Sequence, residues 1–86
     1  MAARVYVVRV AEGPDLHVII TRVFKGTSAE ADSRDFYQRT KRVYEMKANN
    51  KKISYNLTLA IQDKKGIKDS KVLEVLFDER ISPHHH

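Results

Sequence analysis

The chain has 86 residues and a formal net charge of +5, from 16 Lys and Arg against 11 Asp and Glu. This length suits one domain with a modest core and excludes two. The sequence contains no cysteine, which excludes disulfides, thiolate nucleophiles and cysteine-based zinc sites. The positive charge favours acidic partners, such as nucleic acid or anionic proteins, without choosing between them.

The ends of the sequence indicate a cytoplasmic protein. No apolar run approaches the length of a membrane span, and Met1–Arg4 does not lead into the apolar core of a signal peptide. The terminal residues His84, His85 and His86 are typical of a purification tag, because consecutive histidines on a frayed tail hold no rigid metal geometry. We therefore expect one domain over residues 1–83 and no membrane partner.

The first predicted element is a β-hairpin. Residues 4–10 are rich in β-branched and aromatic side chains, and residues 16–24 repeat this composition after a turn at Glu12–Asp15 that contains Gly and Pro. Side chains of a strand alternate between its two faces. The alternation predicts one apolar face formed by Tyr6, Val8, Val10, Leu16, Val18, Ile20 and Phe24.

The same hairpin predicts a second apolar face, made of Val5, Val7, Ile19 and Val23. A single helix covers one face of a small sheet, so this second face needs its own cover. The C-terminal segment folded as a helix, a second subunit or another protein would each provide it. We interpret these four residues as a candidate protein interface, with an unpaired sheet edge as another route to association.

A long helix is predicted next. Thr27–Glu30 fits a capping box, although Asp32 or Ser33 would also serve as the cap. Helical spacing then places an apolar side at Phe36, Tyr37, Thr40, Val43 and Tyr44. The segment 47–50 ends in two asparagines, which accept the left-handed conformation that terminates many helices.

The clearest strand follows at residues 53–62. Ile53, Tyr55, Leu57, Leu59 and Ile61 alternate with smaller or polar residues, so one face of this strand belongs to a core. A turn with a glycine bulge is predicted at residues 63–66, with a further strand beginning at Ile67.

The last segment allows two interpretations. The β-branched content of residues 72–77 favours a strand, whereas a cap at Asp69 or Ser70 would begin a short helix with Leu73, Leu76, Phe77 and Ile81 inward. We favour the strand. The predicted fold is α+β: a small antiparallel sheet from a β-hairpin, a long helix packed on one face, then a second hairpin or a strand plus a short helix.

Basic residues form two clusters. The first nets +5 between residues 34 and 52 and contains Arg34, Arg39, Lys41, Arg42, Lys47, Lys51 and Lys52; the second spans residues 64–71 and contains Lys64, Lys65, Lys68 and Lys71. Together they are candidate contacts for nucleic acid or an acidic protein. A solvated helix face is the simpler alternative, because Asp35 and Arg39, and Lys41 and Glu45, stand four residues apart.

Nothing in the sequence favours catalysis, a metal, a cofactor or a small-molecule substrate. His17 is the single histidine before the tag, and the three glycines are scattered, so neither a catalytic triad nor a phosphate loop is indicated. We predict a non-catalytic protein-interaction or assembly module that forms a homo-oligomer or docks on an acidic partner. The alternative is a small nucleic-acid-binding domain that uses the two basic clusters.

Overall fold

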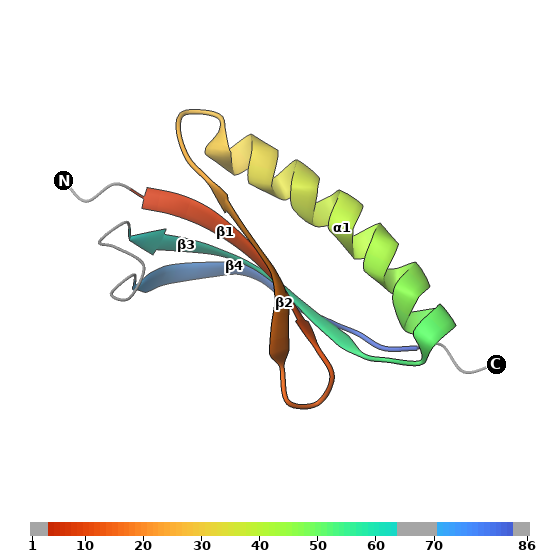
Figure 1. Cartoon of the computed structure of the whole chain (residues 1–86). Helices are drawn as coiled ribbons and strands as arrows, with labels where there is room; N and C mark the ends of the chain where they lie inside the picture. Colours follow the sequence, from red (N-terminus) through yellow and green to blue (C-terminus); the bar gives the residue numbers. More distant parts are fainter. Residues whose placement is uncertain (1–3, 64–70, 84–86) are drawn as a thin grey trace.

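In the computed structural model, which describes residues 4–63 and 71–83, one helix lies across one face of a four-stranded antiparallel sheet (Figure 1). The elements follow in the order β1 (Arg4–Glu12), β2 (His17–Phe24), α1 (Ala29–Lys51), β3 (Tyr55–Asp63) and β4 (Val72–Ile81). The strand order across the sheet is β2-β1-β3-β4, so β2 and β4 form its edges. The predicted α+β fold is confirmed.

The turn of the first hairpin uses two left-handed residues. Gly13 has φ 77° and Leu16 has φ 53°, and the Leu16 N–H donates to the Gly13 carbonyl at 3.3 Å. Glycine adopts this conformation without penalty, whereas leucine does so rarely. Leu16 therefore belongs to the turn, and the return strand begins one residue later than predicted.

A β-bulge changes the facing of side chains in β2. Val10 pairs with Ile20, but the next residue, Ala11, pairs with Val18, so Ile19 is an extra residue in β2. The alternation restarts after such a bulge. Val18 consequently lies on the face away from α1, and the predicted grouping of Val18 with Ile20 is wrong.

The helix begins without the predicted capping box. The N-cap residue is Ser28, and it makes no side-chain cap hydrogen bond. Its Oγ donates instead to Asp32 Oδ2 at 2.9 Å, while the Glu30 carboxylate pairs with Arg34 at 3.4 Å. Because the N-cap is Ser28 and not Thr27, the N3 position is Ala31, which has no side chain able to complete a capping box.

The helix ends later than predicted. It continues through both asparagines to Lys51, and the left-handed C-cap is Lys52, with φ 57° and ψ 40°. The buried residues of α1 form one stripe along its length: Ala29, Ser33, Tyr37, Thr40, Tyr44 and Ala48. Val43 is 48% exposed, so its predicted inward position is wrong.

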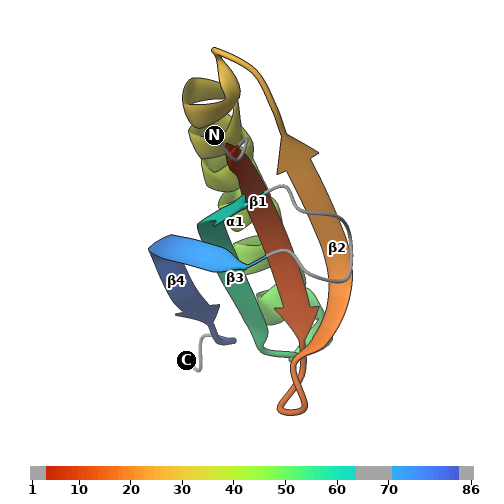
Figure 2. The same cartoon turned by 90° about the vertical axis from the view of Figure 1, so that its left-hand side faces the viewer.

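The C-terminal segment forms β4, as the sequence favoured. Phe77 pairs with Leu59 and Ile81 with Tyr55, so β4 extends the sheet from β3. Register shifts interrupt the pairing on either side of Val75, and β4 bends sharply in its first half (Figure 2). The predicted turn at 63–66 and strand from Ile67 fall largely or wholly on residues 64–70, outside the described residues.

The core lies between α1 and the sheet. Tyr44 meets Tyr55 edge-on, with 4.7 Å between ring centroids, and Phe77 stacks on Tyr37 at 5.0 Å. The buried cluster consists of Val8, Val10, Tyr37, Tyr44, Ala48, Tyr55, Leu57, Leu59 and Ile81. The alternation predicted for Tyr55, Leu57 and Leu59 is confirmed, since all three are buried in this cluster.

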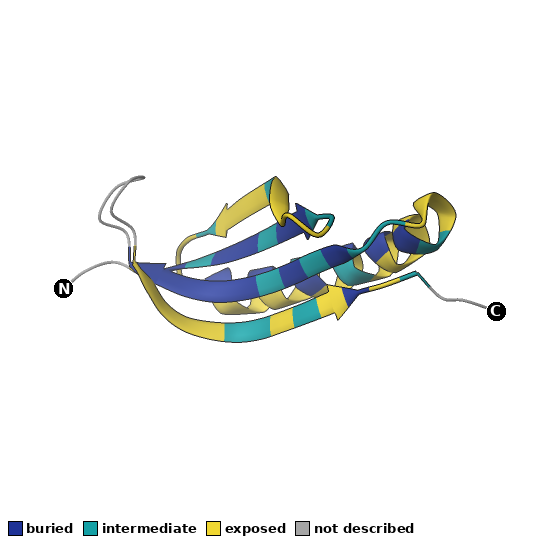
Figure 3. Ribbon diagram, turned by 90° about the horizontal axis from the view of Figure 1, so that it is seen from below, coloured by how far each residue is buried: buried dark blue, intermediate teal, exposed yellow. Residues whose placement is uncertain are grey.

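The face of the sheet away from α1 is buried only at its centre. Val5 pairs with Gln62 and Val7 with Ala60, and all four residues are at most 6% exposed. Seen from below, the central strands are mostly buried, whereas β2 and the first half of β4 are exposed (Figure 3). The exposed apolar side chains of this face therefore lie on the two edge strands.

Candidate binding groove

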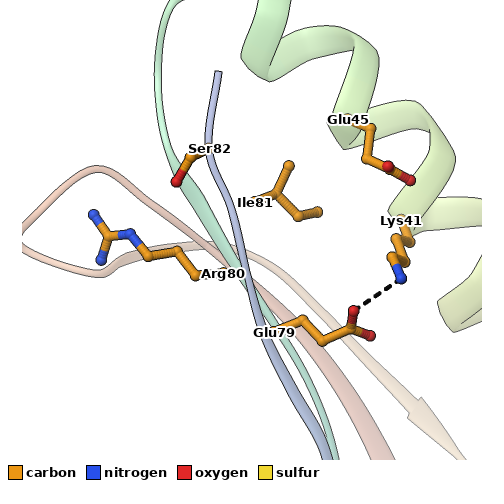
Figure 4. A pocket seen from close by; sticks show the side chains of 6 residues that line it. All are labelled: Lys41, Glu45, Glu79, Arg80, Ile81 and Ser82. Atoms are coloured by element: carbon orange, nitrogen blue, oxygen red, sulfur yellow. Dashed lines mark ion pairs between the residues drawn. The ribbon is translucent and has the colours of Figure 1, made fainter. Parts of the chain in front are cut away.

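The two flanks of α1 differ in how they meet the sheet. On the β4 side, Glu79 accepts a hydrogen bond from the Tyr37 hydroxyl at 2.6 Å and pairs with Lys41 Nζ at 2.8 Å. Lys41 and Glu79 point toward each other from α1 and β4 (Figure 4). The Arg34 guanidinium lies 5.4 Å from the centre of the Phe77 ring, so this flank is closed by polar and aromatic contacts.

These contacts alter the ionisation of the groups on the β4 flank. The Lys41 ammonium, followed by the Tyr37 hydroxyl, lowers the pKa of Glu79 because both hydrogen-bond its charged form. Burial, with Glu79 close by, raises the pKa of Tyr37, and Glu79 raises the pKa of Lys41. A hollow of about 140 Å³ remains beside them, lined by Lys41, Glu45, Glu79, Arg80, Ile81 and Ser82.

On the β2 side, a larger groove of about 520 Å³ separates α1 from the sheet edge. Its lining combines apolar and aromatic side chains with cations: Ile20, Arg22, Phe36, Arg39, Thr40, Val43, Tyr44 and Lys47. Among these described lining residues there is no carboxylate. We call this site the α1/β2 groove.

Aromatic rings and one carboxylate hold the cations of the α1/β2 groove. The Arg22 guanidinium lies 5.7 Å from the ring centre of Phe24 and 5.5 Å from that of Phe36. Lys47 Nζ lies 4.9 Å from the ring centre of Tyr44, whereas Arg39 pairs with Asp35. Within the described chain, neither Arg22 nor Lys47 has a carboxylate within ion-pair distance, so both positive charges remain available to bind an acidic partner.

The sheet edge beside the groove is also open. β2 has one hydrogen-bonded neighbour within the described sheet, which is β1. Backbone N–H and C=O groups on the outer side of such an edge strand are available to another strand. The exposed side chains of Val18 and Val23 lie along this edge, on the face away from α1.

The structure separates the four predicted interface residues. Val5 and Val7 are buried on the central strand β1, so the chain covers them without a partner. Ile19, at the bulge, and Val23 are 38% and 46% exposed on β2. Only the β2 pair is available at the surface.

The predicted basic residues are likewise divided. Arg34 and Arg39 pair with acids of α1 itself, and Lys41 pairs with Glu79 of β4. Arg42, Lys47 and Lys51 lie exposed on α1, with Lys52 at its C-cap. Of the second cluster, Lys71 lies exposed just before β4. Lys64, Lys65 and Lys68 lie outside the described residues, so the predicted union of the two clusters stays a prediction.

Sequence reasoning missed the α1/β2 groove, although one signal for it was present. Arg22 pairs with Val8 and shares the facing of Ile20 and Phe24, so a charged residue occupies the helix-facing side of an apolar strand. Charged residues are seldom buried unless they are paired, so a charge at this position suggests that it lies at the margin of the core. Helical spacing predicts Phe36, Thr40, Val43 and Tyr44 in the core, whereas Arg39 and Lys47 belong to the predicted basic cluster, so neither pattern indicated that these six residues line one groove.

In the described part of the chain, no helix is long and apolar enough to cross a membrane. The same residues contain no cluster of three or more His, Cys, Asp and Glu side chains able to hold a metal ion. In comparisons with known proteins, no protein-family model, no curated protein and no solved structure matches the chain.

Proposed function

We propose that this chain is a small non-catalytic protein-interaction module that docks an acidic, extended segment of a protein partner in the α1/β2 groove. The observation that carries the proposal is the composition of the groove. Its apolar lining, from residues such as Ile20 and Val43, is bordered by three cations, with no carboxylate among the described lining residues. Such a site accepts aliphatic side chains and neutralises neighbouring carboxylates.

The position of the groove supports an extended partner. The groove runs beside the β2 edge, where a partner strand could form backbone hydrogen bonds while alternate side chains enter the groove. In this arrangement Arg22, on the helix-facing side of β2, lies next to the added strand. Its guanidinium would pair with an acidic side chain of that strand.

Nucleic-acid binding, the alternative, has less support from the side chains. Single-stranded nucleic acid is usually stacked on exposed aromatic rings. Here Tyr37, Tyr44 and Tyr55 are buried, and Phe36 is partly buried against Phe24. Phe36, the partly exposed ring of the α1/β2 groove, is already in contact with the Arg22 guanidinium.

The proposal can be tested with a short labelled peptide in which valine alternates with glutamate, followed by fluorescence anisotropy. We expect the unmodified protein to bind this peptide and Val43→Glu to weaken binding about tenfold or more, because it places a carboxylate in the groove. Met46→Glu is the matched control, since Met46 is a 68% exposed residue of α1 outside the groove lining.

Two results would reject the proposed site. One is equal weakening by Val43→Glu and Met46→Glu, which would indicate a general effect of negative charge on α1. The other is equal binding of a peptide in which valine alternates with lysine, because the cations of the groove should repel it.

A further inference from the structure

The sheet edge opposite the groove carries a strand of complementary chemistry. Between Val72 and Glu79, β4 has three carboxylates and no basic residue. At its start, Val72, Leu73 and Val75 are 48%, 48% and 54% exposed around the exposed Glu74. This is an extended segment on an open edge, with an acid on the side of the sheet that α1 covers and aliphatic side chains on the other. Its acid matches the cations of the α1/β2 groove, and its aliphatic side chains match Val18 and Val23 on the face of β2 away from α1.

Resting on the proposed function, we infer that the segment docked in the α1/β2 groove is the start of β4 from a second copy of this chain. The copies would then associate head to tail, with β4 of one copy beside β2 of the next. Glu74 pairs with Ile61 on the side of the sheet that α1 covers, so the contact would bring it to the cations bordering the groove. Val72 and Val75 pair with Gln62 and Ala60 on the opposite face, where they would pack against Val18 and Val23 of the neighbouring β2.

The strand directions suit this arrangement. β2 is antiparallel to β1, β1 to β3 and β3 to β4, so β4 runs opposite to β2 within one chain. A second copy shifted sideways along the sheet therefore presents its β4 antiparallel to β2 without being inverted. Both copies also keep α1 on the same face, so one antiparallel sheet continues from copy to copy.

Charge disfavours the two symmetric alternatives. Pairing two β2 edges would bring Arg22 and Lys25 of both copies to one seam, and β2 itself contains no acid to offset them. Pairing two β4 edges would bring together Glu74 and Asp78 of both copies. Like charges across a contact oppose association, whereas the head-to-tail contact joins opposite charges.

The contact is short, which sets its expected strength. The bulges of β4 interrupt its regular pairing and bend it, so only the first few residues reach the neighbouring groove. A small heterologous contact of this kind forms reversibly and leaves an open groove and an open edge at the two ends of the assembly. We expect association that increases with protein concentration rather than a permanent dimer.

A mixing experiment tests the inference by light scattering on a sizing column over a range of concentrations. Val43→Glu disables the groove and leaves β4 intact, whereas Val75→Lys disables β4 and leaves the groove intact. We expect the molar mass of the unmodified protein to rise with concentration and each variant alone to remain a monomer. An equal mixture should form a heterodimer of one copy of each and grow no further, because only one intact groove and one intact edge remain.

Other outcomes reject self-association and separate it from the proposed function. If the unmodified protein stays monomeric, or associates while the mixed variants do not, the head-to-tail contact is wrong. Titrating Val75→Lys with the valine–glutamate peptide then tests whether the proposed function survives. Binding of the peptide leaves the groove as a site for another acidic protein, and absence of binding rejects the proposed function as well.

Discussion

At the scale of single residues, Glu79 makes the most specific connection between the sheet and the helix. One carboxylate oxygen accepts the Tyr37 hydroxyl at 2.6 Å, and the other lies 2.8 Å from Lys41 Nζ. Hydrogen bonds to a charged acceptor are stronger than those between neutral groups. Because the Glu79 side chain is 37% exposed, solvent weakens the ion pair, and the buried tyrosine contact matters more for stability.

Glu79 predicts a pH dependence of folding. Its pKa is lower in the folded protein than the ordinary 4.5, so its stabilisation is present above about pH 4.5 and is lost as the pH falls toward the folded pKa. Glu79→Gln should lower the free energy of unfolding by about 1 kcal/mol at neutral pH and flatten its decline between about pH 5 and 3. Urea unfolding at a series of pH values measures both effects.

Glu45→Gln provides the control for this pH dependence. Glu45 lies on α1 in the same hollow as Glu79, but it is exposed and forms no ion pair within the described chain. Glu45→Gln should leave the decline of the free energy of unfolding at acidic pH unchanged. If the free energy of unfolding declines identically at acidic pH for Glu79→Gln and the unmodified protein, Glu79 is not the cause of that decline.

At the scale of elements, the orientation of α1 decides which of its side chains form the core and which form the α1/β2 groove. The buried stripe runs from Ala29 to Ala48 and includes Tyr44, whose ring contacts Tyr55. Val43 is its neighbour in sequence, yet it is half exposed at the margin of the groove. Helical spacing alone had placed both residues in the core, because a stripe read from sequence has no sharp boundary.

This orientation predicts unequal effects for two adjacent truncations. Tyr44→Ala should lower the free energy of unfolding by about 3 kcal/mol, because it removes a buried ring from the core. Val43→Ala should lower it by less than about 0.5 kcal/mol, because surface substitutions usually have little effect. Chemical denaturation of both variants checks the rotation of α1; a larger loss from Val43→Ala would mean that the helix faces the sheet differently.

At the scale of the whole molecule, the excess positive charge is not spread evenly. Arg34, Arg39 and Lys41 are engaged by acids, whereas Arg22 and Lys47 border the α1/β2 groove without an acidic partner in the described chain. The opposite edge, β4, carries Glu74 and Asp78, with no basic residue before Arg80. The net charge alone favours an acidic partner, and the difference in charge between the two edges supports the proposed association of a strand with the groove.

The nucleic-acid alternative makes a separate prediction. In about 0.15 M salt we expect a labelled single-stranded oligonucleotide to bind the unmodified protein more weakly than about 10 μM, since the described cations are partly paired and the rings are mostly covered. Fluorescence anisotropy over a salt series measures this. Tighter binding that loses affinity and salt dependence when Arg39, Arg42 and Lys51 are changed to Ala together would favour the alternative.

The sequence by itself determined the local elements of this protein. The alternation of Tyr55, Leu57 and Leu59 predicted β3, and the composition of residues 4–24 predicted the first hairpin, because each pattern depends only on neighbours in the chain. The same reasoning favoured β4 over a helix. It did not locate the bulge at Ile19 or the left-handed C-cap at Lys52, since these depend on how strands pair and where the helix meets the sheet.

Only the tertiary structure decided which surfaces are available to a partner. Val5 and Val7 had the same apolar pattern as Val23, but β1 lies inside the sheet and β2 at its edge, so only Val23 remains exposed. The α1/β2 groove likewise joins residues of β2 to residues of α1 that are more than a dozen positions away in the chain. Burial at these positions is set by strand order and helix rotation, which are properties of long-range contacts and leave no periodic signal in the sequence.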